Sequence, residues 1–239
     1  MRLVQPLFAV CLLLLVMPAR GDAVADAEGL WEYTGLITRD GQSLPLTGVF
    51  LIANDVFLQQ SIFDGEPFAR QGSMAHVGPY WGGGAGLRLR SDQTLSMEPG
   101  ADAPLRSAGA LEHDLTVSRD GDELTLVFSA GEGTVQTFQR LGDGRDTRLY
   151  QFADGALAFT DDYFILVIGD EREAVTGYGG YRQAGDVLVL DAVRWAASNG
   201  ERVLNLRDAP VSVRFDEKTL TLPGGRVIPV LERPGENHE

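Results

Sequence analysis

The stretch Gly48-Val-Phe-Leu-Ile-Ala-Asn-Asp-Val-Phe-Leu58 returns later in the chain as Gly155-Ala-Leu-Ala-Phe-Thr-Asp-Asp-Tyr-Phe-Ile165. Three pairs of positions are identical at one constant offset: Gly48 and Gly155, Asp55 and Asp162, and Phe57 and Phe164. In each copy, two apolar runs flank an Asn-Asp or Asp-Asp step, and these residue types tolerate the positive φ that a tight hairpin turn requires. The stretch therefore predicts a β-hairpin that the chain contains twice.

The repetition continues beyond this hairpin. Asp120–Leu126 matches Asp216–Leu222, and Thr137–Arg140 matches Val230–Arg233, in the same order. A repeat of this kind marks copies of one structural unit and has to be recognised before the architecture is predicted. We expect one unit over residues 29–141 and a second over 148–233, with a Gly- and Asp-rich linker over 142–147 and a polar tail over 234–239.

Both units have the pattern of an all-β fold, with short alternating apolar runs bounded by Gly, Asp, Asn and Pro. The strands expected in the first unit are Trp31–Leu36, Gly48–Ala53, Val56–Ile62, Ser73–Val77, Gly86–Arg90, Leu115–Arg119, Leu124–Phe128 and Val135–Arg140. Those expected in the second are Arg148–Phe152, Ala156–Thr160, Tyr163–Ile168, Val175–Arg182, Val187–Asp191, Val211–Phe215, Thr219–Leu222 and Val227–Arg233. The stretches Gly78–Gly86 and Glu98–Arg106 are predicted as loops.

About eight antiparallel strands are enough to close a barrel whose interior holds side chains or one small ligand. The sequence thus predicts two tandem antiparallel β-barrels. The alternative is that the two repeats merge into one larger barrel or sandwich.

The N-terminus predicts export. Arg2, an apolar run from Leu7 to Met17 and the small residues that follow form the pattern of a signal peptide over residues 1–23, with cleavage after Ala23 or Ala25. The apolar run is shorter than the ~20 residues of a transmembrane helix, so no membrane span is expected. We expect a periplasmic or secreted protein. Cys11, the one cysteine, would leave with the leader, so the mature chain would have neither a disulfide nor a thiolate nucleophile.

Charge and motif content exclude several functions. The chain has a net charge of −14, which repels phosphates, so nucleic acid and anionic membranes are not expected partners. There are three histidines, and the spacings His-x-His, Glu-x-x-His and Cys-x-x-Cys are missing, so no metal site is predicted. The Gly-x-Ser-x-Gly signature of a serine hydrolase is missing too. We expect no cofactor, and the sequence predicts no oligomeric state.

Several short motifs resemble the bacterial lipocalin-like domain family. The first unit opens with Gly29-Leu-Trp31, the Gly-x-Trp start of lipocalins, and Arg140 stands where lipocalins place an arginine that stacks over that tryptophan. The second unit lacks Gly-x-Trp, but its order of motifs is similar to that of the family. These motifs are Gly155–Val167, Tyr178-Gly-Gly-Tyr181, Phe215–Leu222 and Leu231–Arg233. In the first unit, the alignment places His76 opposite Tyr181 and Ser73 opposite Tyr178.

The resemblance implies small barrels that bind a small apolar molecule, and some relatives isomerise, cyclise or hydrate one. It supplies no catalytic residues, and a fold alone does not define a function. The first hypothesis is therefore an exported lipocalin-like protein that binds or carries a small, mostly apolar molecule. The alternative is an isomerase, cyclase or hydratase that uses general acid/base catalysis in a barrel cavity. The residues that could supply the acid and base are His76, Tyr178, Tyr181 and Asp162.

Barrel mouths are concave and mostly apolar, so aromatic residues near them are candidate ligand contacts. The candidates are Tyr80, Trp81, Tyr163, Tyr178, Arg194 and Trp195. Tyr178 and Tyr181 are three residues apart, so they should point to opposite faces of a strand. Arg194 beside Trp195 could hold an anionic head group, or it could be a solvated arginine on a loop. We expect any site to lie in one barrel, in its loops, or at the seam between the two units.

Overall fold

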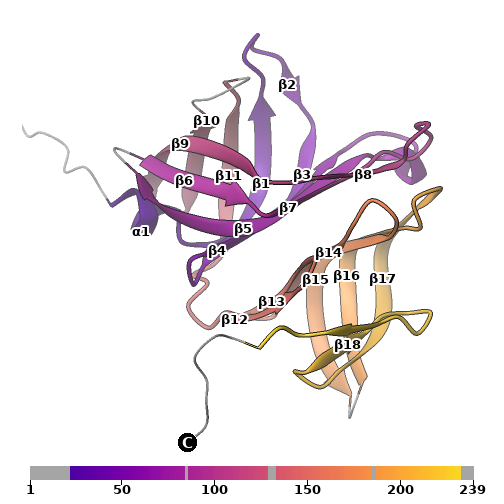
Figure 1. Ribbon diagram of the computed structural model, residues 1–239. Helices are drawn as coiled ribbons and strands as arrows, with labels where there is room; N and C mark the ends of the chain where they lie inside the picture. Colours follow the sequence, from indigo (N-terminus) through magenta and orange to yellow (C-terminus); the bar gives the residue numbers. More distant parts are fainter. Residues whose placement is uncertain (1–21, 84–85, 129–132, 185–186, 233–239) are drawn as a thin grey trace, which may run out of the picture.

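The computed structural model describes residues 22–83, 86–128, 133–184 and 187–232. The fold is 67% strand and 4% helix and forms two eight-stranded antiparallel barrels, one closed and the other nearly closed (Figure 1). The predicted fold class is confirmed, and the repeats do not merge into one sheet. Within the described ranges, no helix is long and apolar enough to cross a membrane.

Barrel 1 is a closed ring. Its strands, in order around the ring, are β1 (Gly29–Ile37), β3 (Leu46–Ala53), β4 (Val56–Phe63), β5 (Ser73–Gly83), β6 (Gly86–Ser91), β9 (Leu111–Asp120), β10 (Glu123–Phe128) and β11 (Val135–Gly142). The ring closes where β11 pairs with β1 and places Trp31 opposite Arg140. Three short strands lie outside the ring: β2 (Ser43–Leu44), β7 (Gln93–Met97) and β8 (Leu105–Ala108).

Barrel 2 is a simple meander in which each strand pairs with the next. Its strands are β12 (Arg148–Phe152), β13 (Gly155–Thr160), β14 (Tyr163–Gly169), β15 (Ala174–Ala184), β16 (Val187–Ser198), β17 (Val203–Phe215), β18 (Thr219–Thr221) and β19 (Val227–Pro229). A backbone hydrogen bond of 2.8 Å from Leu231 N to Gln151 O spans the remaining gap. The barrel therefore closes without a full ladder between its first and last strands.

Two predicted details are wrong. β5 continues through Gly78–Gly83, which the sequence analysis placed in a loop, and β16 extends to Ser198, so Arg194 lies on a strand. Glycine is needed inside β5 because a Cβ at Gly78 would lie 1.9 Å from the carbonyl oxygen of Arg90. Gly179 in β15 has φ +153° and the same constraint, with Asp191 O at 2.3 Å from its would-be Cβ. These glycines mark close backbone approach and not a loop.

Strand pairing shows which positions of the two barrels are equivalent. Phe57 pairs with Gly78, and its repeat partner Phe164 pairs with Gly179. Counting along the strands from these glycines, Tyr80 is the equivalent of Tyr181. The predicted alignment of His76 with Tyr181 is therefore wrong by four residues, because sequence similarity in this strand is too low to fix the register.

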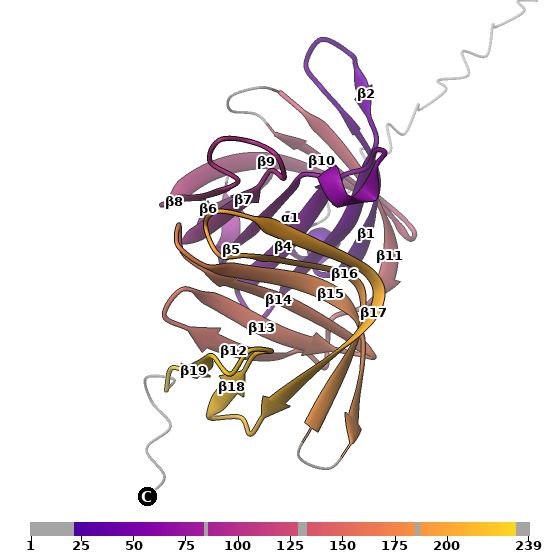
Figure 2. The same ribbon diagram turned by 90° about the vertical axis from the view of Figure 1, so that its right-hand side faces the viewer.

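The molecule has three apolar cores. One fills the lumen of barrel 1 and one fills the lumen of barrel 2. The third lies between the barrels and holds residues of both. In Figures 1 and 2 the barrels stack on one another, with β4 and β5 next to β14 and β15. We call this third core the seam; its buried members are Leu30, Val49, Leu51, Ala53, Leu58, Ile62, Ala75, Val77, Leu95, Met97, Leu105, Leu149, Ala156, Ala158, Ile165, Val167, Ala174, Tyr178 and Ala196.

The duplicated hairpin explains the seam. Successive side chains of a strand point to opposite faces. In β3, Leu51 faces the seam while Phe50 faces the lumen, and in β13 Ala158 and Leu157 divide in the same way. Both faces of the repeated hairpin are therefore buried, which accounts for its nearly continuous apolar sequence. Alanines on the barrel 2 side let the two sheets approach closely.

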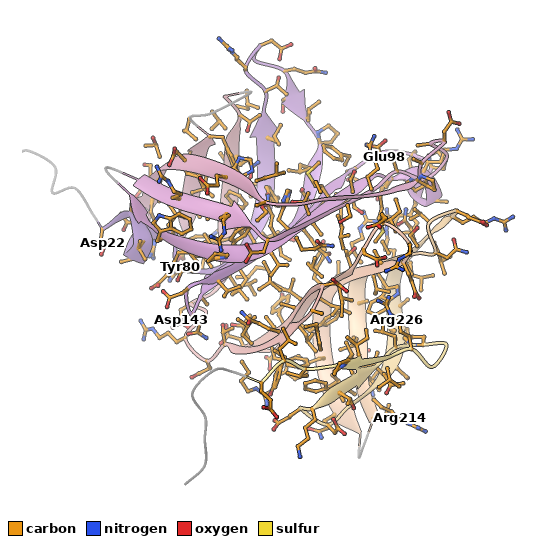
Figure 3. All side chains as sticks on the ribbon, in the orientation of Figure 1. Asp22, Tyr80, Glu98, Asp143, Arg214 and Arg226 are labelled. Carbon is orange, nitrogen blue, oxygen red and sulfur yellow. The ribbon has the colours of Figure 1, made fainter. Side chains whose placement is uncertain are left out.

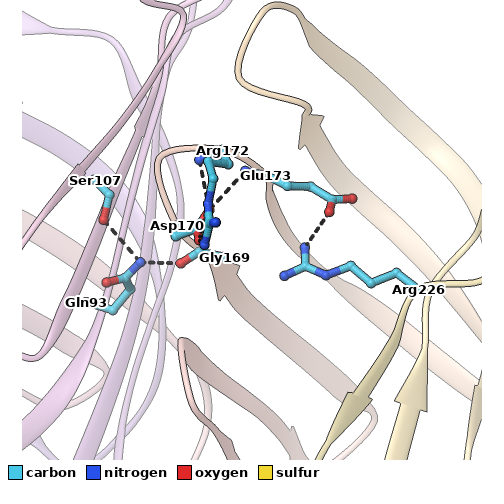
Figure 4. Close-up of polar contacts among 7 residues, drawn as sticks. All are labelled: Gln93, Ser107, Gly169, Asp170, Arg172, Glu173 and Arg226. Carbon is cyan, nitrogen blue, oxygen red and sulfur yellow. Dashed lines mark hydrogen bonds and ion pairs between the residues drawn. The ribbon is translucent and has the colours of Figure 1, made fainter.

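Polar side chains also cross the seam. Gln60 Nε2 donates to Leu166 O, and Asn205 Nδ2 donates to Gln71 O, both at 3.0 Å. Figure 4 shows Gln93 of β7 reaching the carbonyl of Gly169 at the end of β14. Amide hydrogen bonds of this kind fix the position of one barrel on the other.

The seam predicts a measurable loss of stability. Ile165→Ala removes a fully buried side chain from it and should lower the free energy of unfolding by about 2–5 kcal/mol. Val127→Ala, at a side chain that is 36% exposed, should change it by less than about 0.5 kcal/mol. Urea unfolding followed by circular dichroism measures both. Equal effects of the two substitutions would contradict a tightly packed seam.

Candidate functional site

A short helix plugs one end of barrel 1. Helix α1 (Ala23–Ala27) begins after Asp22, whose side chain accepts a hydrogen bond from Val24 N, and Ala27 is fully buried. Figure 3 shows Tyr80 on the barrel beside this helix. Most of the expected signal peptide, residues 1–21, lies outside the described residues, and the expected cleavage points after Ala23 and Ala25 lie within α1.

Side chains of β1, β5 and β11 hold this plug in place. Trp31 Nε1 donates to Ala27 O at 2.8 Å, and the Tyr80 hydroxyl donates to Glu28 Oε1 at 2.9 Å. The guanidinium of Arg140 lies 4.9 Å from the Trp31 ring centroid and donates to Glu28 O at 3.0 Å. This is the stacked arginine that the resemblance implies. Trp31, Tyr80 and Arg140 are thus used to seal barrel 1.

The same end of barrel 2 is open. The strand pairing places Arg148 where Gly29 stands in barrel 1 and Tyr150 where Trp31 stands. In place of the plug, the described residues leave a pocket that opens to solvent and has a cavity volume of about 80 Å³. We call it the barrel 2 pocket; its lining residues are Arg148, Phe159, Tyr181, Gln183, Val187, Leu188, Phe215 and Glu217.

The floor of the barrel 2 pocket is aromatic. The ring centroids of Phe159 and Tyr181 are 4.7 Å apart, and those of Phe159 and Phe215 are 5.8 Å apart. Tyr150 packs behind them, 4.8 Å from Phe215. Aromatic clusters with tilted or edge-on rings are rigid and favour the binding of another flat apolar group.

Two charged groups stand at the edge of this floor. The Arg148 guanidinium lies 5.5 Å from the Phe159 centroid, and its Nη2 is 3.4 Å from the Tyr181 hydroxyl. The Tyr181 hydroxyl donates to Asp161 O at 3.2 Å. Glu217 accepts a hydrogen bond of 3.2 Å from the Tyr150 hydroxyl. The pocket therefore combines an apolar base with a cation and a carboxylate at its edge.

All six predicted ligand contacts lie away from this pocket. Tyr163 and Tyr178 pack into the seam, and Trp81 is exposed on β5. Tyr178 faces Arg194 across β15 and β16. Trp195 packs into the core of barrel 2, and it borders a pocket between the barrels together with Arg194.

The four candidate acid/base side chains do not form one cluster, although Tyr181 N donates to Asp162 O at 3.3 Å. His76 is buried among barrel 1 residues, where its Nδ1 lies 3.0 Å from Thr94 Oγ1 and 3.2 Å from Ser91 Oγ. Tyr178 is in the seam and Tyr181 in the barrel 2 pocket. Asp162 is exposed in the β13–β14 turn, beside Asp161 with φ +47°. The turn role predicted for these acidic residues fits this geometry.

Burial shifts the pKa values of two of these residues, His76 and Tyr178. Burial, reinforced by nearby His113, lowers the pKa of His76 to about 4, so the imidazole is neutral at pH 7. Burial raises the pKa of Tyr178 to about 12, against the opposing charge of Arg194. Both groups keep their neutral forms at pH 7 in separate places.

No cluster of three or more His, Cys, Asp and Glu side chains suited to a metal ion occurs in the ranges that the structure describes. Comparison with protein-family models, curated proteins and solved structures finds no match to this chain. The functional argument therefore depends on the geometry of the site.

Of the residues that line the barrel 2 pocket, the sequence singled out only Tyr181, as a candidate acid or base and not as a ligand contact. Arg148, Phe159, Phe215 and Glu217 come from strands and a turn that are far apart in the sequence. One signal did point to it. The second unit lacks the Gly-x-Trp start, and the missing tryptophan is the residue that holds the plug in barrel 1.

His76 predicts a pH dependence of stability. Between pH 6.5 and 4 the unfolded chain protonates this histidine while the folded protein does not, so stability should fall as the pH falls through that window. Each unit of pKa difference corresponds to about 1.4 kcal/mol. His76→Gln supplies an amide that can hydrogen-bond to Ser91 and Thr94 but does not titrate. The free energy of unfolding of this variant should therefore fall less than that of the wild type between pH 6.5 and 4.

The measurement is urea unfolding of both proteins at several pH values. His113→Gln is the matched control. It should change the pH dependence of stability less than His76→Gln does, because His113 is only partly buried. Parallel stability curves for the wild type and His76→Gln would show that His76 is not a buried neutral group.

Proposed function

We propose that this protein binds or carries a small, mostly apolar molecule at the open end of barrel 2. One observation carries the proposal: the corresponding ends of the two barrels differ in structure. The end of barrel 1 is sealed by α1, Trp31 and Tyr80, whereas the end of barrel 2 presents aromatic rings to solvent. Exposed aromatic surface in a concave place is typical of a ligand site.

The chemistry of the pocket supports a ligand with a flat ring. Tyr181 and Phe215 are partly exposed and offer apolar ring surface over the buried Phe159, in a pocket that opens to solvent. Arg148 at the edge favours a polar or negatively charged substituent on that ring. The lumen below is filled by the barrel 2 core, so the ligand would stay near the mouth and exchange with solvent.

The proposal includes export to the periplasm or outside the cell, which rests on the signal-peptide pattern, and membership of the lipocalin-like group, which rests on the motifs. The acidic composition supports solubility in such a compartment. Enzymatic isomerisation, cyclisation or hydration gains no support. His76 lies in barrel 1, Tyr178 lies in the seam, and Tyr181 lies in the barrel 2 pocket beside the exposed turn residue Asp162.

The test is binding of a fluorescent anilinonaphthalene sulfonate dye, which combines a flat ring system with one negative charge. Gln183→Trp puts a large ring into the pocket from its exposed rim, and it should weaken dye binding about tenfold or more. Arg182→Trp is the matched control, because the neighbouring side chain points to the opposite face of β15. It should change the affinity less than about twofold.

Arg148→Met tests the charge separately. It should weaken binding of naphthoate, measured by displacement of the dye, and leave an uncharged naphthalene ligand unaffected. Equal dye affinity in Gln183→Trp and the wild type would place the binding site elsewhere and overturn the proposal.

A further inference from the structure

The seam contains a second pocket, away from the barrel 2 pocket. It lies where the β4–β5 connection of barrel 1 meets β15, β16 and β17 of barrel 2; its cavity volume is about 20 Å³, and it opens to solvent. We call it the seam pocket; its lining residues are Gln60, Ile62, Gln71, Ser73, Thr176, Arg194, Trp195, Ala196, Asn205 and Leu206. Two of them, Arg194 and Gln71, are incompletely satisfied.

Arg194 is a nearly buried cation that hydrogen-bonds to the Tyr178 side chain but has no carboxylate within hydrogen-bond distance. Its side chain is 12% exposed, and the nearest carboxylate oxygen, Asp64 Oδ1, is 3.7 Å from Nη2, which is too long for a hydrogen bond. Arg207 is a second cation nearby, and its charge affects the pKa of Arg194 more than the charge of Asp64 or of Asp208 does. Burial, followed by Arg207, lowers the pKa of Arg194, which shows that its environment disfavours the charged form.

The ring of Phe68 orients the guanidinium. Phe68 belongs to η1 (Phe68–Arg70), which packs on β17, and its centroid lies 4.6 Å from Arg194 Cζ. A ring stacked on a guanidinium covers its face and leaves the N–H groups at its edge for other partners. That edge is suited to the two oxygens of a carboxylate.

Gln71 supplies the second, independent observation. Its side chain is 5% exposed, and its Oε1 is buried without a hydrogen-bond partner. The orientation of the amide is fixed, because Nε2 donates to Asp64 Oδ1 at 2.6 Å and to Gly65 O at 2.8 Å. An acceptor left unpaired in a buried place costs about 1–3 kcal/mol, so a donor that reaches it is favoured.

Arg194 and Gln71 stand side by side, since both approach the same oxygen of Asp64. The geometry points to a site for a small carboxylate that carries a hydroxyl or N–H donor next to the carboxyl group. The carboxylate binds Arg194, the donor bonds to Gln71 Oε1, and the apolar remainder lies against Ile62 and Leu206. A single negative charge fits better than a phosphate dianion, because Asp64 and Asp208 are close.

The experiment compares α-hydroxyhexanoate with hexanoate by isothermal titration calorimetry on the full chain. The wild type should bind the hydroxy acid about tenfold more tightly, because only the hydroxyl satisfies Gln71. Gln71→Met should reduce this preference to within about twofold. Arg194→Met should abolish binding of both acids, and Arg214→Met, at an exposed arginine outside the pocket, should leave it unchanged.

Circular dichroism establishes that each variant is folded, and Arg194→Lys provides a second test because it keeps the charge but loses the planar fork. It should bind both acids more weakly than the wild type. Equal affinity of the wild type for the two acids would overturn the assignment. Equal affinity is also the result expected if a bound water already satisfied Gln71 Oε1. Gln183→Trp should bind the hydroxy acid normally, so this test is separate from that of the barrel 2 pocket.

Discussion

The burial of both faces of one duplicated hairpin is the constraint on which the rest of the structure depends. β3–β4 and β13–β14 each send one set of side chains into their own barrel and the other set into the seam. A barrel strand normally has one face in water, so apolar residues on the outer face require a cover. Each barrel provides that cover for the other, and the two repeats become one folded unit.

This arrangement also separates the two candidate sites by their physical origin. The barrel 2 pocket lies where, among the described residues, the second repeat has no counterpart of the tryptophan and the helix that seal the first, and its floor is aromatic. The seam pocket exists because two curved sheets cannot stay in contact at their margins, and polar side chains of both line the space that remains. Duplication thus supplied a scaffold, and the differences between the copies supply the chemistry.

The sequence predicted the fold well where a single physical rule decides it. Turn residues marked the hairpins, and Asn54, Asp55, Asp161, Gly121 and Glu217 all adopt the expected positive φ. Alternation placed Tyr178 and Tyr181 on opposite faces. Prediction failed where glycine serves two purposes: Gly78–Gly83 have the composition of a loop, but they lie in a strand, and at Gly78 the neighbouring backbone approaches too closely for a side chain.

By itself, the sequence determined that the chain is a repeated all-β protein with two units, since periodicity and turn chemistry are local properties that residues express wherever they lie. Only the tertiary structure decided which end of which barrel is open and which polar atoms lack partners. Arg148 and Phe215, or Gln71 and Arg194, meet through strand pairing and barrel packing over large sequence separations. No local sequence pattern predicts these contacts, because they depend on how the sheets curve and on which residues the seam brings together.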